Sequence, residues 1–160
     1  MAIAWTKELD TQIEVIDNQH KRIVHYINQL ETAIEQHSRA LVEQVLEELV
    51  DYTQSHFAFE ESLLEEVGYS LIQPHKAVHN LFIKRVEKYL EKHNKGADVA
   101  EQLHAMLSAW LMHHIKRDDM AYVSAVSVNI HHVIQDKQEG NWLSRSLAQF
   151  FKPMRLSRDF

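Results

Sequence analysis

Apolar side chains recur every three or four residues along four long stretches of this chain. That spacing returns side chains to one face of an α-helix, so each stretch is expected to form a helix with one buried face. The four helices are predicted to cover roughly residues 16–34, 45–67, 74–90 and 98–131. Breaks fall near residues 37–40, 68–73 and 94–97, so the connections between the helices are short.

Short connections between long amphipathic helices favour antiparallel neighbours. The 160 residues include only three glycines and two prolines, which is too little punctuation for many short strands and hairpins. We therefore predict an all-α protein, an antiparallel up-down-up-down four-helix bundle. Residues 1–134 are assigned to the bundle with its N-terminal arm (1–15), and residues 135–160 to a C-terminal amphipathic extension.

Local signals place two of the helix starts. Pro74 suits the first turn of the third helix, because a residue there needs no backbone N–H donor. Asp98 is a predicted N-cap for the fourth helix. The run Asn94-Lys95-Gly96 is expected to end the third helix.

Polar side chains occupy several positions on the apolar faces of these predicted helices. His20 lies in step with Ile16 and Ile23, and His114 lies in step with Leu107 and Trp110. The inward set comprises five histidines and one glutamate from four helices: His20, His56, Glu60, His75, His79 and His114. The other histidines considered are expected to be solvated or peripheral: His25, His37, His93, His104, His131 and His132.

Burying so many polar groups costs free energy unless each is paired or binds a metal. Imidazole and carboxylate ligands suit zinc, iron, copper or nickel, and the chain has no cysteine thiolate to offer. More ligands converge than one four-coordinate metal needs, which favours a binuclear site. The usual carboxylate-bridged di-iron bundle would carry Glu-x-x-His on two helices. This chain has one such motif, Glu101 to His104, and His104 lies off the stripe that contains His114.

Four motifs together resemble the bacterial hemerythrins, over roughly residues 5–125. The motifs are Ile16-Asp17-Asn18-Gln19-His20, His56-Phe57 with Glu60-Glu61, His75-x-x-x-His79, and Trp110-Leu111-x-x-His114-Ile115 followed by Asp119. The resemblance implies that two irons, joined by an oxo or hydroxo bridge, are bound by His20, His56, Glu60, His75, His79, His114 and Asp119. Glu60 and Asp119 would be the bridging carboxylates.

The second bridging carboxylate is the position where spacing and resemblance differ. Helical geometry alone pairs His114 with Asp118, because a five-residue step turns a side chain about 140° away on an α-helix. The family's His-Ile-x-x-x-Asp register selects Asp119 instead. We follow the family, which leaves Asp118 and His113 as surface or rim groups.

The resemblance implies reversible binding of dioxygen at a non-haem di-iron centre, for storage, delivery or scavenging. Trp110, Leu111 and Tyr122 are candidates for the apolar shell of the oxygen pocket. The sequence shows no nucleophile, general-acid pair or phosphate loop, so we do not expect an enzyme. Two alternatives stay open: a di-iron oxygen or redox sensor acting through the C-terminal extension, and an enzyme that reduces peroxide or oxidises iron.

Composition limits the remaining partners. A net charge of −6 without a basic cluster in the main body argues against nucleic-acid binding, which requires phosphate neutralisation. No targeting segment or membrane-spanning run is visible, which predicts a cytoplasmic protein of undetermined oligomeric state.

The C-terminal extension is predicted to form one more amphipathic helix. Its apolar face carries Leu143, Leu147, Phe150, Phe151 and Met154, its positive charge comes from Arg145, Lys152, Arg155 and Arg158, and Pro153 would end or kink it. This helix either folds back onto its own bundle, or docks to a protein partner or an anionic membrane surface through residues 141–158.

Overall fold

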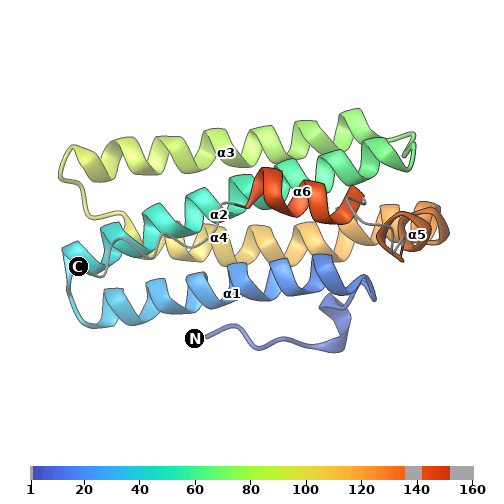
Figure 1. The fold of residues 1–160 in the computed structure, drawn as a ribbon. Helices are drawn as coiled ribbons and strands as arrows, with labels where there is room; N and C mark the ends of the chain where they lie inside the picture. The colour runs from blue at the N-terminus through green and yellow to red at the C-terminus, as the bar shows by residue number, and fades with distance from the viewer. Residues whose placement is uncertain (1, 136–141, 152–160) are drawn as a thin grey trace.

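The computed structural model describes residues 2–135 and 142–151, and these residues form helices without a strand. Four long helices lie side by side and run alternately in opposite directions (Figure 1). They are α1 (Glu14–Glu35), α2 (Arg39–Glu66), α3 (Ile72–Asn94) and α4 (Ala100–His114). The prediction of an antiparallel four-helix bundle is confirmed.

The connections between these helices fall where the breaks were predicted. α2 ends at Glu66, and Gly68 follows with a positive φ of 71°, a conformation that glycine adopts without steric cost. Its N–H donates to the carbonyl of Glu65, and the next N–H, of Tyr69, donates to that of Leu64. Pro74 lies in the first turn of α3, as predicted.

The predicted N-cap of the fourth helix is wrong. α4 begins at Ala100 after Val99, and no side chain caps this end. Val99 and Ala100 are both buried in the structure. Burial of these two residues outweighs the local preference of Asp98 for a cap position.

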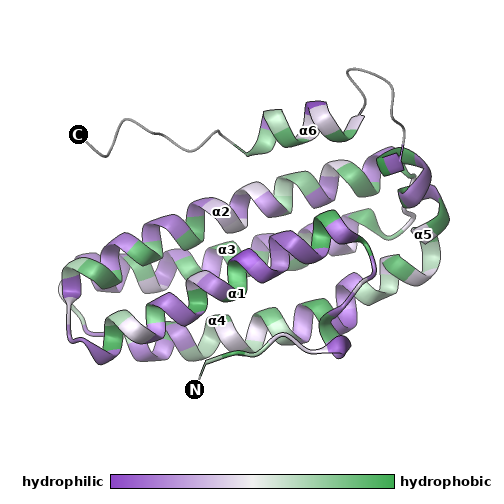
Figure 2. Ribbon diagram, turned by 60° about the horizontal axis from the view of Figure 1, so that its bottom comes forward, coloured by the Kyte–Doolittle hydropathy of each residue, from purple (hydrophilic) through white to green (hydrophobic). Residues whose placement is uncertain are grey.

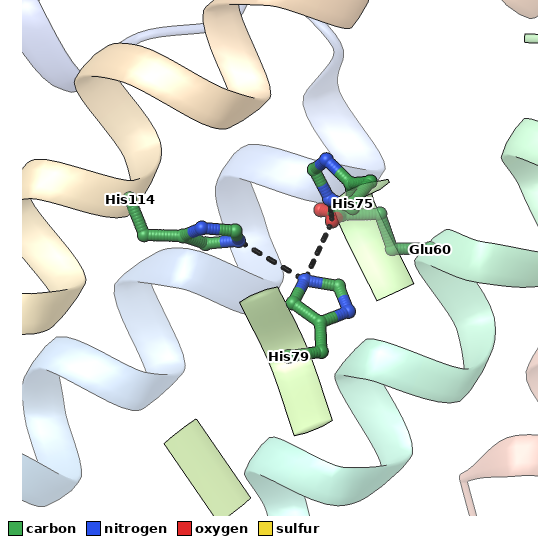
Figure 3. A group of neighbouring side chains, drawn as sticks. All are labelled: Glu60, His75, His79 and His114. Carbon is green, nitrogen blue, oxygen red and sulfur yellow. Dashed lines mark hydrogen bonds and ion pairs between the residues drawn. The ribbon is translucent and has the colours of Figure 1, made fainter. Parts of the chain in front are cut away.

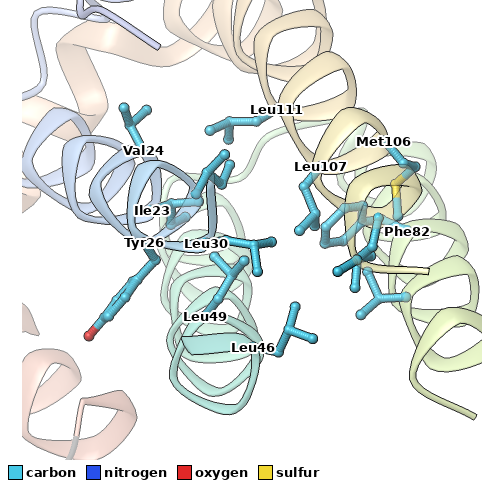
Figure 4. Packing of buried hydrophobic residues seen from close by; sticks show 14 of the residues in the cluster. Ile23, Val24, Tyr26, Leu30, Leu46, Leu49, Phe82, Met106, Leu107 and Leu111 are labelled. Atoms are coloured by element: carbon cyan, nitrogen blue, oxygen red, sulfur yellow. The ribbon is translucent and has the colours of Figure 1, made fainter. Parts of the chain in front are cut away.

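The predicted apolar stripes form the core between the helices. Ile27, Leu30, Leu49 and Leu103 are at most 1% exposed and belong to one apolar cluster. Figure 4 shows Leu30 and Leu49 among the side chains of this cluster. Hydrophilic residues predominate on the outward surfaces of the helices (Figure 2). Each such buried aliphatic side chain stabilises the fold by about 1.5–3 kcal/mol relative to an exposed one.

The fourth predicted helix is interrupted rather than continuous. After α4 the chain forms a π-helical segment, Ile115–Asp119, and then α5 (Met120–Gln135). Within α5 the backbone leaves helical values at Val126, where φ is −133°. The chain turns there, and α5 crosses one end of the bundle (Figures 1 and 2). Its buried residues Tyr122 and Ile130 belong to a second apolar cluster, with Phe59 of α2.

The N-terminal arm is held against the bundle by two groups of hydrogen bonds. The amide side chain of Asn28 both accepts from the N–H of Ile3 (2.8 Å) and donates to its carbonyl (3.0 Å). The buried carboxylate of Asp17 accepts from the N–H and hydroxyl of Thr11, at 2.9 and 2.7 Å, and from the N–H of Gln12. A 3₁₀ turn, Lys7–Leu9, lies within the arm.

The described part of the C-terminal extension folds back onto the bundle. Helix α6 (Trp142–Phe150) lies along α2 (Figures 1 and 2), and the ring of Trp142 is 5.5 Å from that of Phe59. Phe151 packs against Phe59 and Tyr52 at ring distances of 5.9 and 5.3 Å. The predicted roles of Lys152, Pro153, Met154, Arg155 and Arg158 lie outside the described residues.

None of the described helices combines the length and the apolarity that a bilayer span requires.

Candidate metal centre

The structure brings all seven predicted ligands together at the end of the bundle that α5 covers. α1 supplies His20, α2 supplies His56 and Glu60, α3 supplies His75 and His79, and the α4 region supplies His114 and Asp119. Every one of these side chains is buried, with at most 5% of the residue exposed. Three imidazoles and a carboxylate of this set appear in Figure 3.

Glu60 lies between two groups of histidines. Its Oε1 atom is 2.6 Å from His75 Nε2 and 3.3 Å from His79 Nε2. Its Oε2 atom faces the other way, 3.5 Å from His56 Nε2 and 4.0 Å from His20 Nε2. Two potential metal-binding groups therefore share this carboxylate: Glu60, His75, His79 and His114 form the first, and His20, His56 and Glu60 form the second.

Asp119 has the same divided arrangement. Its Oδ1 atom lies 3.2 Å from His114 Nε2 and 3.4 Å from His75 Nε2. Its Oδ2 atom lies 3.1 Å from His20 Nε2. Both carboxylates thus direct one oxygen to the three-histidine group and one to the two-histidine group.

The π-helical segment explains how Asp119 reaches this position. A π-helix bonds residue i to residue i+5 and so turns less per residue than an α-helix, in which 3.6 residues complete one turn. Residues 114 and 119 therefore lie on the same side of the chain across Ile115–Asp119. The expectation from regular α-helical geometry, which placed Asp118 beside His114, described only part of the arrangement.

Asp118 has a different contact with the same imidazole. Its Oδ2 atom accepts a hydrogen bond from His114 Nδ1 at 2.8 Å, and its side chain is partly exposed at the rim. His113 is exposed. The bond to Asp118 leaves the Nε2 atom of His114 directed towards Asp119 and the centre.

Two further histidines have an acceptor behind the ring. His56 Nδ1 donates to the amide oxygen of Gln19 at 2.7 Å, and His79 Nδ1 donates to Glu61 Oε1 at 2.9 Å. Such partners set the tautomer and the ring orientation of a metal-binding histidine. Sequence reasoning assigned no role to Gln19 or Glu61, since no spacing rule within one helix connects residue 19 to residue 56.

The facing imidazole nitrogens of this cluster need a proton or a metal ion between them. His79 Nε2 and His114 Nε2 are only 3.0 Å apart (Figure 3). Because both rings use Nδ1–H as a donor, both facing Nε2 atoms carry lone pairs unless a proton or metal ion neutralises them. Neither nitrogen of His20 and neither oxygen of Asp119 has a hydrogen-bond partner among the described residues, although all four atoms are buried. This donor set fits metal binding.

The charges of the cluster shift its pKa values strongly in the metal-free protein. Burial raises the pKa of Glu60, but hydrogen bonds from His75 and His79 outweigh it and hold that pKa well below its usual value. Burial lowers the pKa of His79, yet its bonds to Glu60 and Glu61 raise the net pKa to about 9. Burial keeps the pKa of His56 well below the ordinary value despite the nearby Glu60 carboxylate. The Glu60 carboxylate thus retains its negative charge, as a metal ligand must.

A small cavity adjoins the two-histidine group. We call it the inner cavity. His20, His56 and His114 form part of its wall, and aliphatic and aromatic side chains form most of the rest, including Trp110 and Leu111. It offers about 10 Å³ to the centre of a water-sized molecule, which is the room that a single such molecule needs.

The three predicted pocket residues have different positions. Leu111 lines the inner cavity, as does Trp110, whose ring stacks on His114 with centroids 4.4 Å apart. Tyr122 is not among the lining residues. Its fully buried hydroxyl donates to Glu60 Oε2 at 3.2 Å. Burial, together with the negative charges of Glu60 and Asp119, raises the pKa of Tyr122 well above its usual value, so the hydroxyl keeps its proton.

The histidines expected to be solvated or peripheral mostly lie outside the core. His25, His37 and His132 are exposed, and His104 and His131 are partly exposed. His104 faces Glu31, with Nε2 and Oε2 3.9 Å apart, and belongs to neither metal-binding group. His93 departs from the expectation. It is 3% exposed, and its Nε2 atom lies 3.3 Å from Glu43 Oε1, so a carboxylate oxygen faces the buried ring.

Comparisons with known proteins agree with this geometry. Residues 11–126 match the family model for the hemerythrin HHE cation binding domain, so the chain belongs to the hemerythrin family. It is 50% identical over 149 residues to a bacteriohemerythrin of Pseudomonas aeruginosa, which covers 93% of this chain and 97% of that protein. A bacteriohemerythrin of Stenotrophomonas maltophilia is 45% identical over the same length, with the same coverage of both chains.

Solved structures show the same fold. A crystal structure of a wild-type hemerythrin has a TM-score of 0.74 and 29% identity, and the match covers 79% of this chain and 99% of that one. Members of the family typically bind oxygen through a non-haem di-iron centre and are generally not enzymes.

Proposed function

We propose that this protein binds two irons at the cluster and uses them to bind dioxygen reversibly. His75, His79 and His114 would hold one iron, His20 and His56 the other, and Glu60 and Asp119 would bridge them. The main support for the proposal is the position of the two carboxylates. Each directs one oxygen to the three-histidine group and the other oxygen to the two-histidine group. A single metal ion would leave one of these groups without a cation.

The unequal histidine groups indicate where dioxygen would bind. The group with two imidazoles offers one nitrogen fewer than the other, and its members His20 and His56 both line the inner cavity. When bound, an iron pair supplies the electrons and the free coordination position that dioxygen requires. The histidines and carboxylates would hold the irons beside the apolar inner cavity.

The surrounding residues favour binding over turnover. The hydroxyl of Tyr122 stays protonated against Glu60, so it stabilises the negative charge of this carboxylate. Leu111 and Trp110 help to line the inner cavity, and their apolar surfaces offer water no hydrogen bonds. An oxygen molecule held here would be shielded from bulk water and its protons. We therefore propose a non-enzymatic role in oxygen storage, delivery or scavenging.

The test is an iron determination combined with visible spectroscopy. The protein is reduced without air, exposed to oxygen and then deoxygenated. About two irons per chain, with an absorption band that appears with oxygen and disappears on its removal, is the expected result. His20→Ala should lower the iron content and abolish the band, whereas His25→Ala, which changes an exposed histidine of the same helix, should leave both unchanged. Irreversible oxidation on first contact with oxygen would contradict reversible binding.

A sensor is the second candidate, because α6 packs directly behind the ligands. Phe59, which contacts Trp142 and Phe151, is adjacent in sequence to the carboxylate of Glu60. A change at Glu60 could therefore alter how α6 docks. Removal of residues 135–160 with unchanged oxygen binding, but loss of a partner protein, would favour the sensor. The cytoplasmic location stays a prediction.

A further inference from the structure

A second cavity lies between α2 and α3, next to the inner cavity. We call it the outer cavity. It offers about 20 Å³ to the centre of a water-sized molecule, twice the room of the inner one. On this measure roughly 10–15 Å³ is the least space that holds one water molecule. The outer cavity contains none of the seven proposed metal ligands, so it is a separate space.

Four residues line both cavities and form the boundary between them, here called the neck. They are Leu49, Thr53, Phe82 and Leu107. All four are buried. Since the same side chains face both spaces, a molecule leaving the outer cavity past the neck enters the inner one beside His20 and His56.

The other end of the outer cavity reaches the surface. The exposure of the remaining lining residues increases towards this end. Val86 is buried, Val50, Ile83 and Leu90 are partly exposed, and Gln54 and Glu87 are exposed. The two polar residues lie at the rim and the aliphatic ones lie inside. The outer cavity therefore opens to the surface between α2 and α3.

The mostly apolar side chains that line the outer cavity favour an apolar molecule over water. A buried water needs two to four polar partners, and Thr53 is the one polar residue in the buried part of the outer wall. Cavities lined by aliphatic and aromatic side chains can stay dry and bind apolar molecules such as xenon. Dioxygen is small, uncharged and apolar, so it gains from leaving water for this space.

We infer that the outer cavity is a docking site for dioxygen, and that oxygen enters and leaves the centre by this route, past the neck. The inference rests on the proposed function, since it names the path by which that function's ligand arrives. An oxygen molecule would pause in the outer cavity and then cross the neck into the inner cavity. The outer cavity touches neither iron-binding group, so it controls rates rather than affinity.

The first test is xenon, whose binding does not require iron. Crystals of the protein under xenon pressure should show an atom in the outer cavity. Val50→Phe fills this cavity from α2 and should abolish the xenon site. Ile83→Phe fills it from α3 and provides a second variant should the first not fold. Val45→Phe makes the same change at another partly exposed position of α2, one that lines neither cavity, and should keep the xenon site.

The second test is the rate of oxygen binding by stopped flow and oxygen release by trapping. In Val50→Phe or Ile83→Phe, the association and dissociation rates should both fall several-fold while their ratio stays constant. Val45→Phe should match the unaltered protein. Unchanged rates in a folded, xenon-free variant would overturn the inference, and so would a wild-type crystal without xenon in the outer cavity. If xenon binds but no oxygen-dependent band is seen, the proposed function fails, and with it the use of this cavity for oxygen.

Discussion

Removing the metal should make the stability of this protein depend steeply on pH, chiefly because of His79. The His79 ring lies 2.9 Å from Glu61 Oε1 and 3.3 Å from Glu60 Oε1. Burial lowers its pKa, but these carboxylates raise the net value from 6.5 to about 9. At about 1.4 kcal/mol for each pH unit, the protonated ring stabilises the folded, metal-free protein by roughly 3 kcal/mol.

The stability of the metal-free protein should decrease as the pH rises, because the pKa of His79 is raised in the folded state. A raised pKa means that the folded state binds the proton more tightly than the unfolded state does. The stabilisation is therefore complete below pH 6.5 and is lost as the pH rises through about 9. The pKa values of His20 and His75 are also raised, since their carboxylate neighbours outweigh burial, so they act in the same direction.

Urea unfolding of the metal-free protein, followed by circular dichroism at a series of pH values, measures the effect. The free energy of unfolding should fall by roughly 3 kcal/mol or more between about pH 6.5 and pH 9. His79→Gln should remove most of this slope, whereas His25→Gln, at an exposed position, should preserve it. In the iron-loaded protein the metal replaces the proton, so the slope should largely disappear. A metal-free protein whose stability is flat or rises over this range would refute the reasoning.

Four further substitutions separate the roles of neighbouring residues. Asp119→Asn should reduce the iron content below two per chain, whereas Asp118→Asn should retain both irons with affinity weakened about 10–100-fold, as for other partners of metal-bound histidines. An iron titration of both variants checks this, and equal losses would count against it. Tyr122→Phe should keep the irons, lower the stability of the loaded protein by about 1.5–3 kcal/mol in urea unfolding, and shift its visible band, because Glu60 loses a donor. Phe59→Ala should cost about 3–5 kcal/mol and shift Trp142 fluorescence to the red as α6 separates from α2. Unshifted fluorescence would show that α6 is held elsewhere.

The sequence by itself determined the bundle and the inward direction of most of the predicted ligands. Both depend on a local regularity, the return of every third or fourth side chain to one face of a helix. His20, between the core residues Ile16 and Ile23, shows how directly this works, since all three are buried as the pattern predicts. Resemblance to a family was needed for Asp119, because regular helical spacing favours Asp118.

The tertiary structure alone decided which groups meet across the helices. The π-helical segment brings Asp119 inward and leaves Asp118 to hold the back of His114. Gln19 supports His56 from another helix, and the outer cavity arises where α2 and α3 leave space between them. These features depend on distances between segments remote in sequence and on small departures from ideal helices. Periodicity within one helix carries no information about either, so packing had to decide them.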